Sequence, residues 1–186
     1  GIGGGGVEDI PLYFWLTTGE EVMVEGGIGS HFNVEAGYNI NPKLGIEVGL
    51  GSHKNSCGAL ENGDGYFLRV PLSVTGIYRF YREEFGNAYG GLGIACYISP
   101  ELYREGLGIE TTVKYDYAFG PHLLIGGDFG LGSVFMFFDL KYAFGIKYKF
   151  NEGIENGISF TTAPCPEWEE IDGSGVLFNM GFGYCF

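Results

Sequence analysis

The chain ends with the stretch Phe178-Asn179-Met180-Gly181-Phe182-Gly183-Tyr184-Cys185-Phe186. This stretch decides the fold class, because every second side chain is large and apolar, which is the two-residue period of a β-strand. In a soluble barrel or sandwich the apolar set would fill the interior. Here the side chains between them are Asn, Gly, Gly and Cys, which fill little space. We therefore predict a strand whose apolar face meets lipid and whose other face lines a narrow interior.

Length and composition fit one membrane-spanning β-domain. The chain has 186 residues, of which 35 are glycine, 17% are aromatic and 18% are charged. We expect a single domain over 1–186, with 1–10 as a flexible N-terminal segment. No stretch approaches the roughly 18 uninterrupted apolar residues of a membrane helix. The start of the chain lacks the charged and apolar regions of a secretory signal, so we expect a mature or trimmed chain. The net charge of −13 argues against nucleic acid as a partner, because nothing would neutralise its phosphates.

The same alternation recurs along the chain and predicts eight strands. Before the closing stretch we expect strands at about 12–18, 31–41, 44–51, 66–81, 87–99, 117–129 and 134–150. The first is the least regular, since 22–29 also has strand character. The seventh is the most regular, with nine apolar positions of one parity at Val134, Met136, Phe138, Leu140, Tyr142, Phe144, Ile146, Tyr148 and Phe150. We expect all nine to face lipid.

The connections between these strands alternate in length. Short links fall at 41–43, 82–86 and 130–133, and long ones at 19–30, 52–65, 100–115 and 151–175. Barrels of the bacterial outer membrane have short periplasmic turns and long external loops in this order. We therefore predict an all-β fold, an eight-stranded antiparallel transmembrane β-barrel of up-and-down topology with both termini in the periplasm. The longest loop is acidic and is a candidate surface for a cation or a partner.

Four internal motifs precede the closing stretch in an order that is found in a known family. They are Asn41-Pro42-Lys43-Leu44-Gly45-Ile46-Glu47-Val48, Val70-Pro71-Leu72-Ser73-Val74-Thr75 running to Tyr78-Arg79-Phe80, Asn87-Ala88-Tyr89-Gly90-Gly91-Leu92-Gly93-Ile94, and Phe119-Gly120-Pro121 followed by Gly127-Asp128. From about residue 31 onward the chain resembles the OmpW-like small outer-membrane barrels, within the wider OmpA-like eight-stranded class. The resemblance implies a lumen open to the outside and closed below, with a lateral exit to the bilayer for small hydrophobic molecules. It also implies that Phe182, Tyr184 and Phe186 form the signal read by the barrel-assembly machinery. That machinery and the membrane lipid or lipopolysaccharide are the expected partners.

Charged side chains fall on the inward parity of the predicted strands. They are Glu35, Glu47, Arg69, Arg79, Asp128, Asp139 and Lys141. Buried charges persist when they are paired and hydrogen-bonded, and an eight-stranded barrel has room for little besides side chains. One interpretation is a structural salt-bridge network that fills the lumen. The other is a narrow polar path whose selectivity these residues set.

Bulky side chains also point inward by parity near the periplasmic end, and we expect them to form a plug. They are Ile77, Tyr89, His122, Phe135 and Phe137. Pro71 and Pro121 each remove one ladder hydrogen bond from the middle of a strand. They mark either a local bend or bulge or, as the family resemblance implies, the lateral opening.

Enzymatic and cofactor chemistry has little support, and we expect no enzyme, cofactor or metal site. Ser52 and His53 are adjacent in a strand, so they face opposite sides and cannot easily share a proton. His31 and His53 could meet at the outer rim, but metal-binding spacings such as HxH or CxxC are missing, and so is the CxxCH motif that attaches haem.

Two cysteines fall in long outer loops. Cys57 and Cys165 would face an oxidising compartment there, which makes a disulfide between them a candidate. Two free thiols, or a bond to another chain, are the alternatives.

Two functions follow from these observations. We predict a narrow passive channel for small hydrophobic solutes, with an external lumen opening and a periplasmic plug. The alternative is a structural or assembly barrel with an inert lumen, whose wall or acidic outer loops bind a partner protein in a larger envelope complex.

Overall fold

The computed structural model describes residues 12–23, 27–56, 64–83, 86–106, 108–131 and 133–185. The strands in these residues are β1 (Leu12–Met23), β2 (Gly27–Asn39), β3 (Leu44–Ser56), β4 (Gly65–Glu83), β5 (Gly86–Gly106), β6 (Ile109–Tyr115), β7 (Ala118–Leu131), β8 (Val134–Ala143), β9 (Lys147–Glu155), β10 (Ile158–Phe160), β11 (Glu170–Asp172) and β12 (Gly175–Cys185). One helical turn, α1 (Pro166–Glu169), precedes β11. Within the described ranges no helix is long and apolar enough to cross a membrane. The expected flexible segment 1–10 lies outside these ranges.

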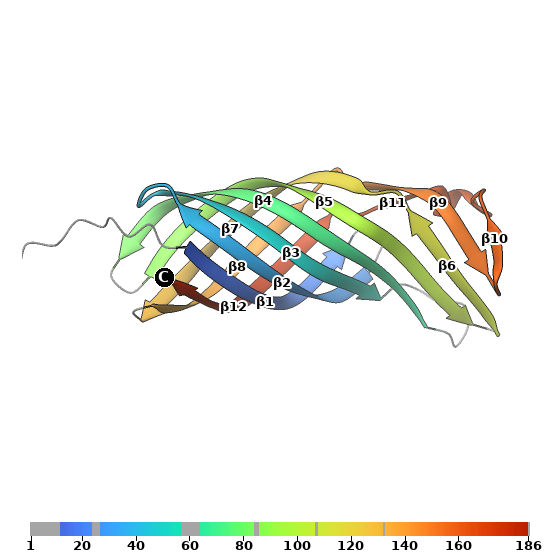
Figure 1. Ribbon diagram of the computed structural model, residues 1–186, viewed down its shortest axis with the longest axis horizontal. Helices are drawn as coiled ribbons and strands as arrows, with labels where there is room; N and C mark the ends of the chain where they lie inside the picture. The colour runs from blue at the N-terminus through green and yellow to red at the C-terminus, as the bar shows by residue number, and fades with distance from the viewer. Residues whose placement is uncertain are drawn as a thin grey trace, which may run out of the picture.

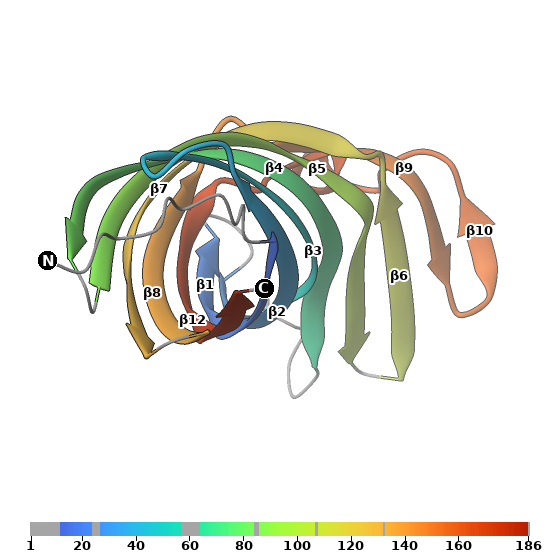
Figure 2. The ribbon, with the colours of Figure 1, turned by 60° about the vertical axis from the view of Figure 1, so that its left-hand side comes forward.

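All strand pairs are antiparallel, and the strands form a curled wall (Figure 1). Pairing runs from β1 through β2, β3 and β4 to β5. β5 then pairs with β7, β7 with β8, β8 with β12, and β12 with β1. Figure 2 shows these strands curling around an interior, with β6, β9 and β10 extending beyond them. In this extension β6 pairs with β5 and β9, while β10 and β11 both pair with β9.

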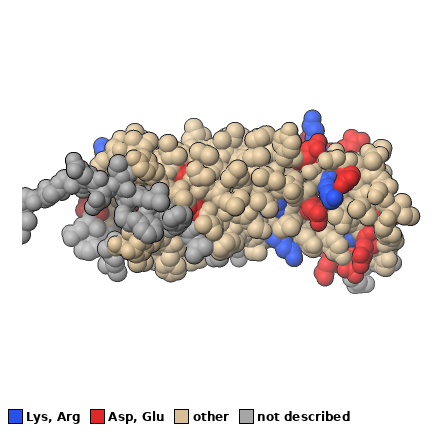
Figure 3. Space-filling view, viewed as in Figure 1, with Lys and Arg blue, Asp and Glu red and all other residues tan. Residues whose placement is uncertain are grey.

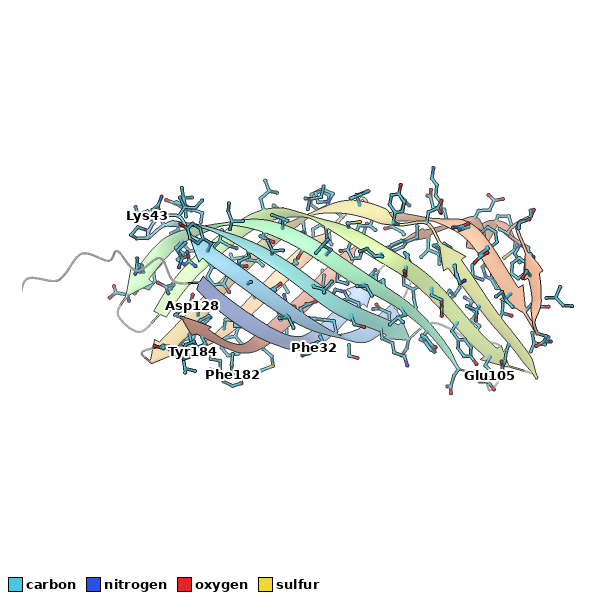
Figure 4. All side chains as sticks on the ribbon, viewed as in Figure 1. Phe32, Lys43, Glu105, Asp128, Phe182 and Tyr184 are labelled. Carbon is cyan, nitrogen blue, oxygen red and sulfur yellow. The ribbon has the colours of Figure 1, made fainter. Side chains whose placement is uncertain are left out.

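The two ends of the molecule differ. One end, called here the terminal end, contains the C-terminus and the turn with Lys43 (Figures 1 and 4). That turn was predicted at 41–43 and is confirmed: the Asn41 side-chain oxygen accepts hydrogen bonds from the backbone N–H groups of Lys43 and Leu44, both at 2.9 Å. The opposite end, called the hairpin end, is formed by the β5–β6 and β9–β10 hairpins and carries Glu105 (Figure 4).

The described residues form twelve strand segments where eight strands were predicted, and much of the predicted long loops is strand. β1 continues to Met23 and β2 starts at Gly27, so 19–30 is mostly a hairpin. The predicted loop 100–115 contains the end of β5 and all of β6, and 151–175 contains β10, α1 and β11. Asn156 and Gly157, with φ of 46° and 83°, join β9 to β10. Asn-Gly is a preferred two-residue hairpin turn. The predictions of long loops at 19–30, 100–115 and 151–175 are therefore wrong, because turn residues such as Asn156 and Gly157 connect strands that continue the sheet. Of the predicted loop 52–65, residues 57–63 lie outside the described residues.

The strand predicted over 134–150 is interrupted in its middle. β8 ends at Ala143 and β9 begins at Lys147, and Gly145 between them has φ 68°, where glycine is favoured. An extra residue of this kind reverses the parity of the strand beyond it. Ile146 and Tyr148 are consequently fully buried. The prediction that all nine apolar positions face lipid is wrong from Ile146 onward.

Neighbouring strands are irregular at the same level, and these positions together are called the seam. They are Ser99 and Pro100 in β5, Asp116 and Tyr117 between β6 and β7, 144–146 between β8 and β9, and Gly173 and Ser174 between β11 and β12. Backbone hydrogen bonds connect adjacent parts of the seam, from Phe144 N–H to Pro121 O at 3.1 Å and from Gly173 N–H to Ile146 O at 2.9 Å. Bulges increase bending and twist. The seam is therefore where the curled wall gives way to the extension.

The predicted distribution of side chains, apolar outside and charged inside, is confirmed for the wall below the seam. The outward apolar side chains are exposed, including Phe32, Val34, Ile46, Val48, Leu50, Leu72, Val74, Leu92, Ile94, Leu123, Ile125, Leu140, Phe178 and Phe182. Glu35, Glu47, Asp139 and Lys141 are buried. The arrangement is the one that a lipid-exposed barrel requires.

The buried side chains form three layers. The aromatic cluster, at the hairpin end, contains Phe67, Ala95, Tyr97, Leu102, Val113, Tyr115, Ala118, Ala143, Ile146, Tyr148 and Leu177. The terminal cluster contains Ile77, Tyr89, Leu124, Phe135 and Phe137. Along β4, β7 and β8 a polar layer lies between these two clusters. With residues from β2, β3 and β12 it comprises His31, Asn33, Glu35, Glu47, His53, Thr75, His122, Asp139, Lys141 and Asn179.

Candidate functional site

An uncharged outer surface surrounds the interior. In the space-filling view of one face, the middle is almost entirely free of charged side chains, and charges gather at the hairpin end over β6, β9 and β10 (Figure 3). Phe32, Phe182 and Tyr184 project from the outer side of the wall (Figure 4). On β2 exposed apolar side chains alternate with buried residues, from Phe32 through Val34 to Tyr38. Such a band is the chemical signature of a surface in contact with hydrocarbon.

An ion pair lies at the centre of the polar layer. Lys141 Nζ is 3.4 Å from Glu35 Oε1, and these side chains are only 10% and 8% exposed. Lys141 comes from β8 and Glu35 from β2, so the pair crosses the interior. Asp139 and Glu47 also act on the Lys141 charge. The Lys141 ammonium group thus makes one ion pair, with Glu35, and the negative charges of Asp139 and Glu47 also favour its retention as a buried charge.

Amides and imidazoles extend this layer around the interior. The Asn179 side-chain N–H donates a hydrogen bond to the Asp139 carboxylate, and the Asn179 side-chain oxygen, Oδ1, is 2.5 Å from His31 Nε2. The rings of His31 and His53 lie with centroids 5.0 Å apart, and His53 Nε2 is 3.2 Å from Asn33 Oδ1. The two histidines therefore meet, as considered from the sequence, but inside the barrel rather than at its rim. Among the described residues no three metal-binding side chains gather around them.

The charged residues predicted as one lumen network occupy three places. Glu35, Glu47, Asp139 and Lys141 lie in the polar layer. Near the terminal end Asp128 accepts a hydrogen bond from the Asn87 amide at 2.6 Å, and Arg79 is half-buried. Arg69 is fully buried in the aromatic cluster instead, because β4 carries it beyond the polar layer.

Glycines opposite bulky residues make these layers possible in a narrow interior. Gly49 pairs with Glu35 and Gly126 with Asp139, and an added Cβ atom would lie 2.9 Å from Glu35 Cγ and 2.6 Å from Asp139 Cβ. Gly183 likewise faces the Phe135 ring across the β8–β12 pair. The glycine content of the chain is therefore partly a packing requirement, since the inward side chain of one strand fills the space that its neighbour leaves.

The terminal cluster contains four of the five predicted plug residues. Ile77, Tyr89, Phe135 and Phe137 pack together, and Cys185 adds a partly buried thiol. His122 is not among them: it lies in the polar layer, where its Nε2 is 2.8 Å from Thr75 Oγ1. Leu124, two positions further along β7, takes the place in the cluster that was assigned to His122. The inward parity of Leu124 was the signal that could have identified it.

The aromatic cluster fills the hairpin end of the interior. Arg69 lies within it, with Cζ 5.2 Å from the Tyr97 ring centroid and Nη1 donating to the Tyr148 hydroxyl at 3.2 Å. Such contacts combine cation–π attraction with a hydrogen bond. The lumen opening expected at this end is therefore occupied by side chains in this structure.

Pro71 and Pro121, the two candidate positions of the lateral opening, differ in their surroundings. Pro71 is buried and pairs with Tyr97 in the β4–β5 ladder, so no opening lies there. Pro121 is exposed and borders the seam. Within the described chain, no ladder pair joins 116–121 to 144–149, although regular pairs flank this interval on both sides. Ile146 packs against the Gly120 backbone across the interval. Backbone hydrogen bonds from Phe144 to Pro121 and from Asp116 to Lys149 cross the interval. The regular ladder of the wall is thus interrupted beside Pro121.

The remaining predicted positions are partly described. Cys165 is a free thiol, so the structure does not support the predicted disulfide, and Cys57 lies outside the described residues. Phe182 and Tyr184 of the expected assembly signal are exposed on the outer face of β12, and Phe186 lies outside the described residues.

Comparisons with known proteins agree with this geometry. Residues 1–186 match the family model described as outer membrane protein beta-barrel domain. The chain is similar to the outer membrane protein OprG of Pseudomonas aeruginosa, with a TM-score of 0.71, 14% identity and coverage of 97% of this chain and 98% of that chain. Neisserial surface protein A matches with a TM-score of 0.59 and 14% identity, covering 98% of this chain and 100% of that chain. AlkL, solved in DMPC lipid bilayers, matches with a TM-score of 0.56 and 15% identity, covering 100% of this chain and 94% of that chain. A search of curated proteins finds no match. At these identities the structural likeness shows the fold.

Proposed function

The chain belongs to the outer membrane protein β-barrel domain family, and on that premise we propose that it is a narrow passive route for small hydrophobic solutes across the bacterial outer membrane. The observation that carries this proposal is continuity of apolar surface. Ala118, Ala143 and Ile146 belong to the aromatic cluster; the two alanines border the seam and Ile146 lies in it. Apolar side chains thus continue from the hairpin end of the interior to the lipid-facing wall.

We further propose that the wall is an eight-stranded barrel. β6 and β7, β8 and β9, and β11 and β12 are each separated by only two or three residues of the seam. Counting each pair as one strand and β10 as part of a hairpin gives eight strands, whose pairing passes from β1 around to β12. In this arrangement the hairpin end is external and both termini are periplasmic, in keeping with short periplasmic turns. The assembly machinery and outer-membrane lipid are its proposed partners.

The layers of the interior suggest a route with a sideways exit. A hydrophobic solute would enter the aromatic cluster at the hairpin end. Further passage along the axis would bring it against the Lys141 and Glu35 ion pair and then the terminal cluster. An apolar molecule does not replace the hydrogen bonds of buried polar groups, so this direction is costly. Exit through the seam beside Pro121 avoids that cost.

Entry of an apolar naphthylamine dye into cells with an intact lipopolysaccharide layer tests the proposal. The dye fluoresces when it reaches phospholipid. We expect its entry rate to rise with the amount of the protein, while entry of a hydrophilic sugar stays at background. Equal dye entry in cells with and without the protein would contradict the proposal.

A second candidate function, a structural or assembly barrel, is favoured by the packing of both ends of the interior. The terminal and aromatic clusters are filled by buried side chains. Native mass spectrometry and planar-bilayer recordings would separate the two functions. A barrel without conductance or dye entry that is always isolated with a protein partner would favour assembly. We propose no catalytic role, since Ser52 is exposed while the adjacent His53 is buried.

A further inference from the structure

One short segment covers the aromatic cluster at the hairpin end. It consists of α1 and β11, residues 166–172, and is called here the cover. Trp168 and Ile171 of the cover are partly buried against the aromatic cluster. The Arg104 guanidinium carbon of β5 lies over the Trp168 ring, 5.6 Å from its centroid. The cover therefore shields part of the aromatic cluster, as Phe150 and Phe160 also do.

The attachments of the cover are weak compared with those of the wall. α1 has no buried residue. β11 pairs with β9 through three residues, whereas β5 and β6 pair through six. Lys147 of β9 adds two ion pairs, to Glu170 and to Asp172, each at 3.4 Å, and its side chain is 48% exposed. Ion pairs with this exposure contribute little free energy.

The aromatic cluster, against which the cover packs, is itself tightly packed. Leu102 and Val113 face each other across β5 and β6 and are 3% and 1% exposed. A molecule can reach them from the hairpin end only if part of the structure moves. Local opening favours segments with few buried contacts. The cover is such a segment, because α1 has no buried residue and β11 has three ladder pairs.

We propose that the cover is displaceable, that Lys147 latches it to β9, and that its release opens the aromatic cluster to apolar molecules from outside. The displacement of the cover is a property of the protein itself. Its role in admitting apolar molecules rests on the proposed function.

Cysteine accessibility measures the displacement without reference to transport. Val113→Cys is introduced into a chain in which Cys57, Cys96, Cys165 and Cys185 are replaced by serine, and labelling by a water-soluble maleimide is followed at neutral pH. In this background we expect Lys147→Ala to increase the labelling rate about fivefold, as the loss of two weak ion pairs would. Lys114→Ala is the matched control, because Lys114 is equally exposed and pairs with Glu152 at 2.8 Å without touching the cover. It should leave the rate unchanged.

A second readout keeps the test valid if Val113→Cys disturbs the fold. In a Trp15→Phe chain Trp168 is the remaining tryptophan, and its quenching by acrylamide should increase with Lys147→Ala and not with Lys114→Ala. Equal labelling rates and equal quenching in the two variants would overturn the proposal that Lys147 latches a displaceable cover.

The same variants separate the cover from the proposed function. Faster labelling together with faster dye entry in Lys147→Ala supports both. Faster labelling with dye entry equal to that of cells lacking the protein supports the cover and contradicts the transport of apolar solutes. An unchanged labelling rate together with protein-dependent dye entry overturns the proposal of a displaceable cover and leaves the proposed function intact.

Discussion

Ile146 packs directly against the backbone of Gly120 across the seam, in space that a side chain at Gly120 would occupy. Ile146 is fully buried, and it closes the interval in which the described β7 and β9 strands have no ladder pairs. A single aliphatic side chain thus fills the place where the regular ladder of the wall is interrupted.

Truncation of Ile146 should loosen this part of the wall. Ile146→Ala removes the group that covers Gly120, and a change of about 1 kcal/mol in the closed state corresponds to about fivefold more frequent opening. We expect dye entry to increase by a similar factor. Ile94→Ala is the matched control, because Ile94 is 54% exposed on the lipid-facing side and pairs with Pro121. Equal dye entry in the two variants would argue against a route through the seam.

Removal of Lys141 should destabilise the barrel more than removal of its partner. Lys141→Met leaves Glu35, Asp139 and Glu47 without their shared cation, and the loss of one partner from a buried pair costs about 3–5 kcal/mol. Glu35→Gln should cost less, because Asp139 and Glu47 still stabilise the ammonium group. Urea unfolding in lipid vesicles, followed by circular dichroism, measures both changes. A larger decrease in the free energy of unfolding for Glu35→Gln than for Lys141→Met would show that the polar layer is not organised around Lys141.

A methyl group at Gly183 should disturb the terminal cluster. Gly183→Ala places a Cβ atom against the Phe135 ring, and overpacking of this kind costs about 1–3 kcal/mol. At Gly76 the nearest atom to an added Cβ is 3.7 Å away, so Gly76→Ala should be nearly neutral. The same unfolding measurement applies, and Phe135→Leu should reduce the cost of Gly183→Ala if the clash is its cause. An unchanged cost would exclude the clash.

The cover should loosen at acidic pH. Partial burial acts to raise the pKa of Asp172, but hydrogen bonds from Ser174 and the Lys147 ammonium outweigh it, so the pKa lies below its usual value. A depressed carboxyl pKa stabilises the folded form above the unfolded value, about 3.9, and this contribution is lost as the pH falls through the folded pKa. Glu170 and Lys149 are the other charged groups at this pairing.

Quenching of Trp168 in the Trp15→Phe chain measures this loosening. We expect acrylamide quenching to stay constant from pH 7 to about 4 and to increase below it. Asp172→Asn should raise quenching at neutral pH. Constant quenching of Trp168 down to pH 3 would contradict the proposal that the Lys147 ion pairs hold the cover on β9.

The sequence predicts the wall better than it predicts the ends. Two-residue periodicity identified the lipid-facing positions and the burial of Glu35, Asp139 and Lys141, because the alternation of inward and outward side chains persists along a regular strand. Periodicity fails where a residue is inserted. The irregular position at Gly145 exchanges the inward and outward positions of the residues that follow it. Tyr148 therefore lies in the aromatic cluster, although its parity in the sequence predicts an outward side chain. The hairpin turn at Asn156-Gly157 was a readable signal that was assigned to a loop.

The site was predictable only in part for the same reason. The terminal cluster follows from parity within four regular strands, β4, β5, β7 and β8, with Leu124 in place of His122. The position of Arg69 among aromatic rings depends on how far β4 extends beyond the polar layer. The Gly120–Ile146 contact depends on two interruptions at one level in different strands, and no local pattern in either strand specifies that level.

The inside-out arrangement is the central claim, and depth-dependent fluorescence quenching in lipid vesicles tests it most directly. Single cysteines at Leu92, which is 63% exposed, and at Glu105 of the hairpin end are labelled with an environment-sensitive fluorophore. Quenchers attached to lipid acyl chains should quench the label at position 92 strongly and the label at position 105 weakly. Strong quenching at position 105 with none at position 92, where an aqueous quencher acts instead, would contradict the account.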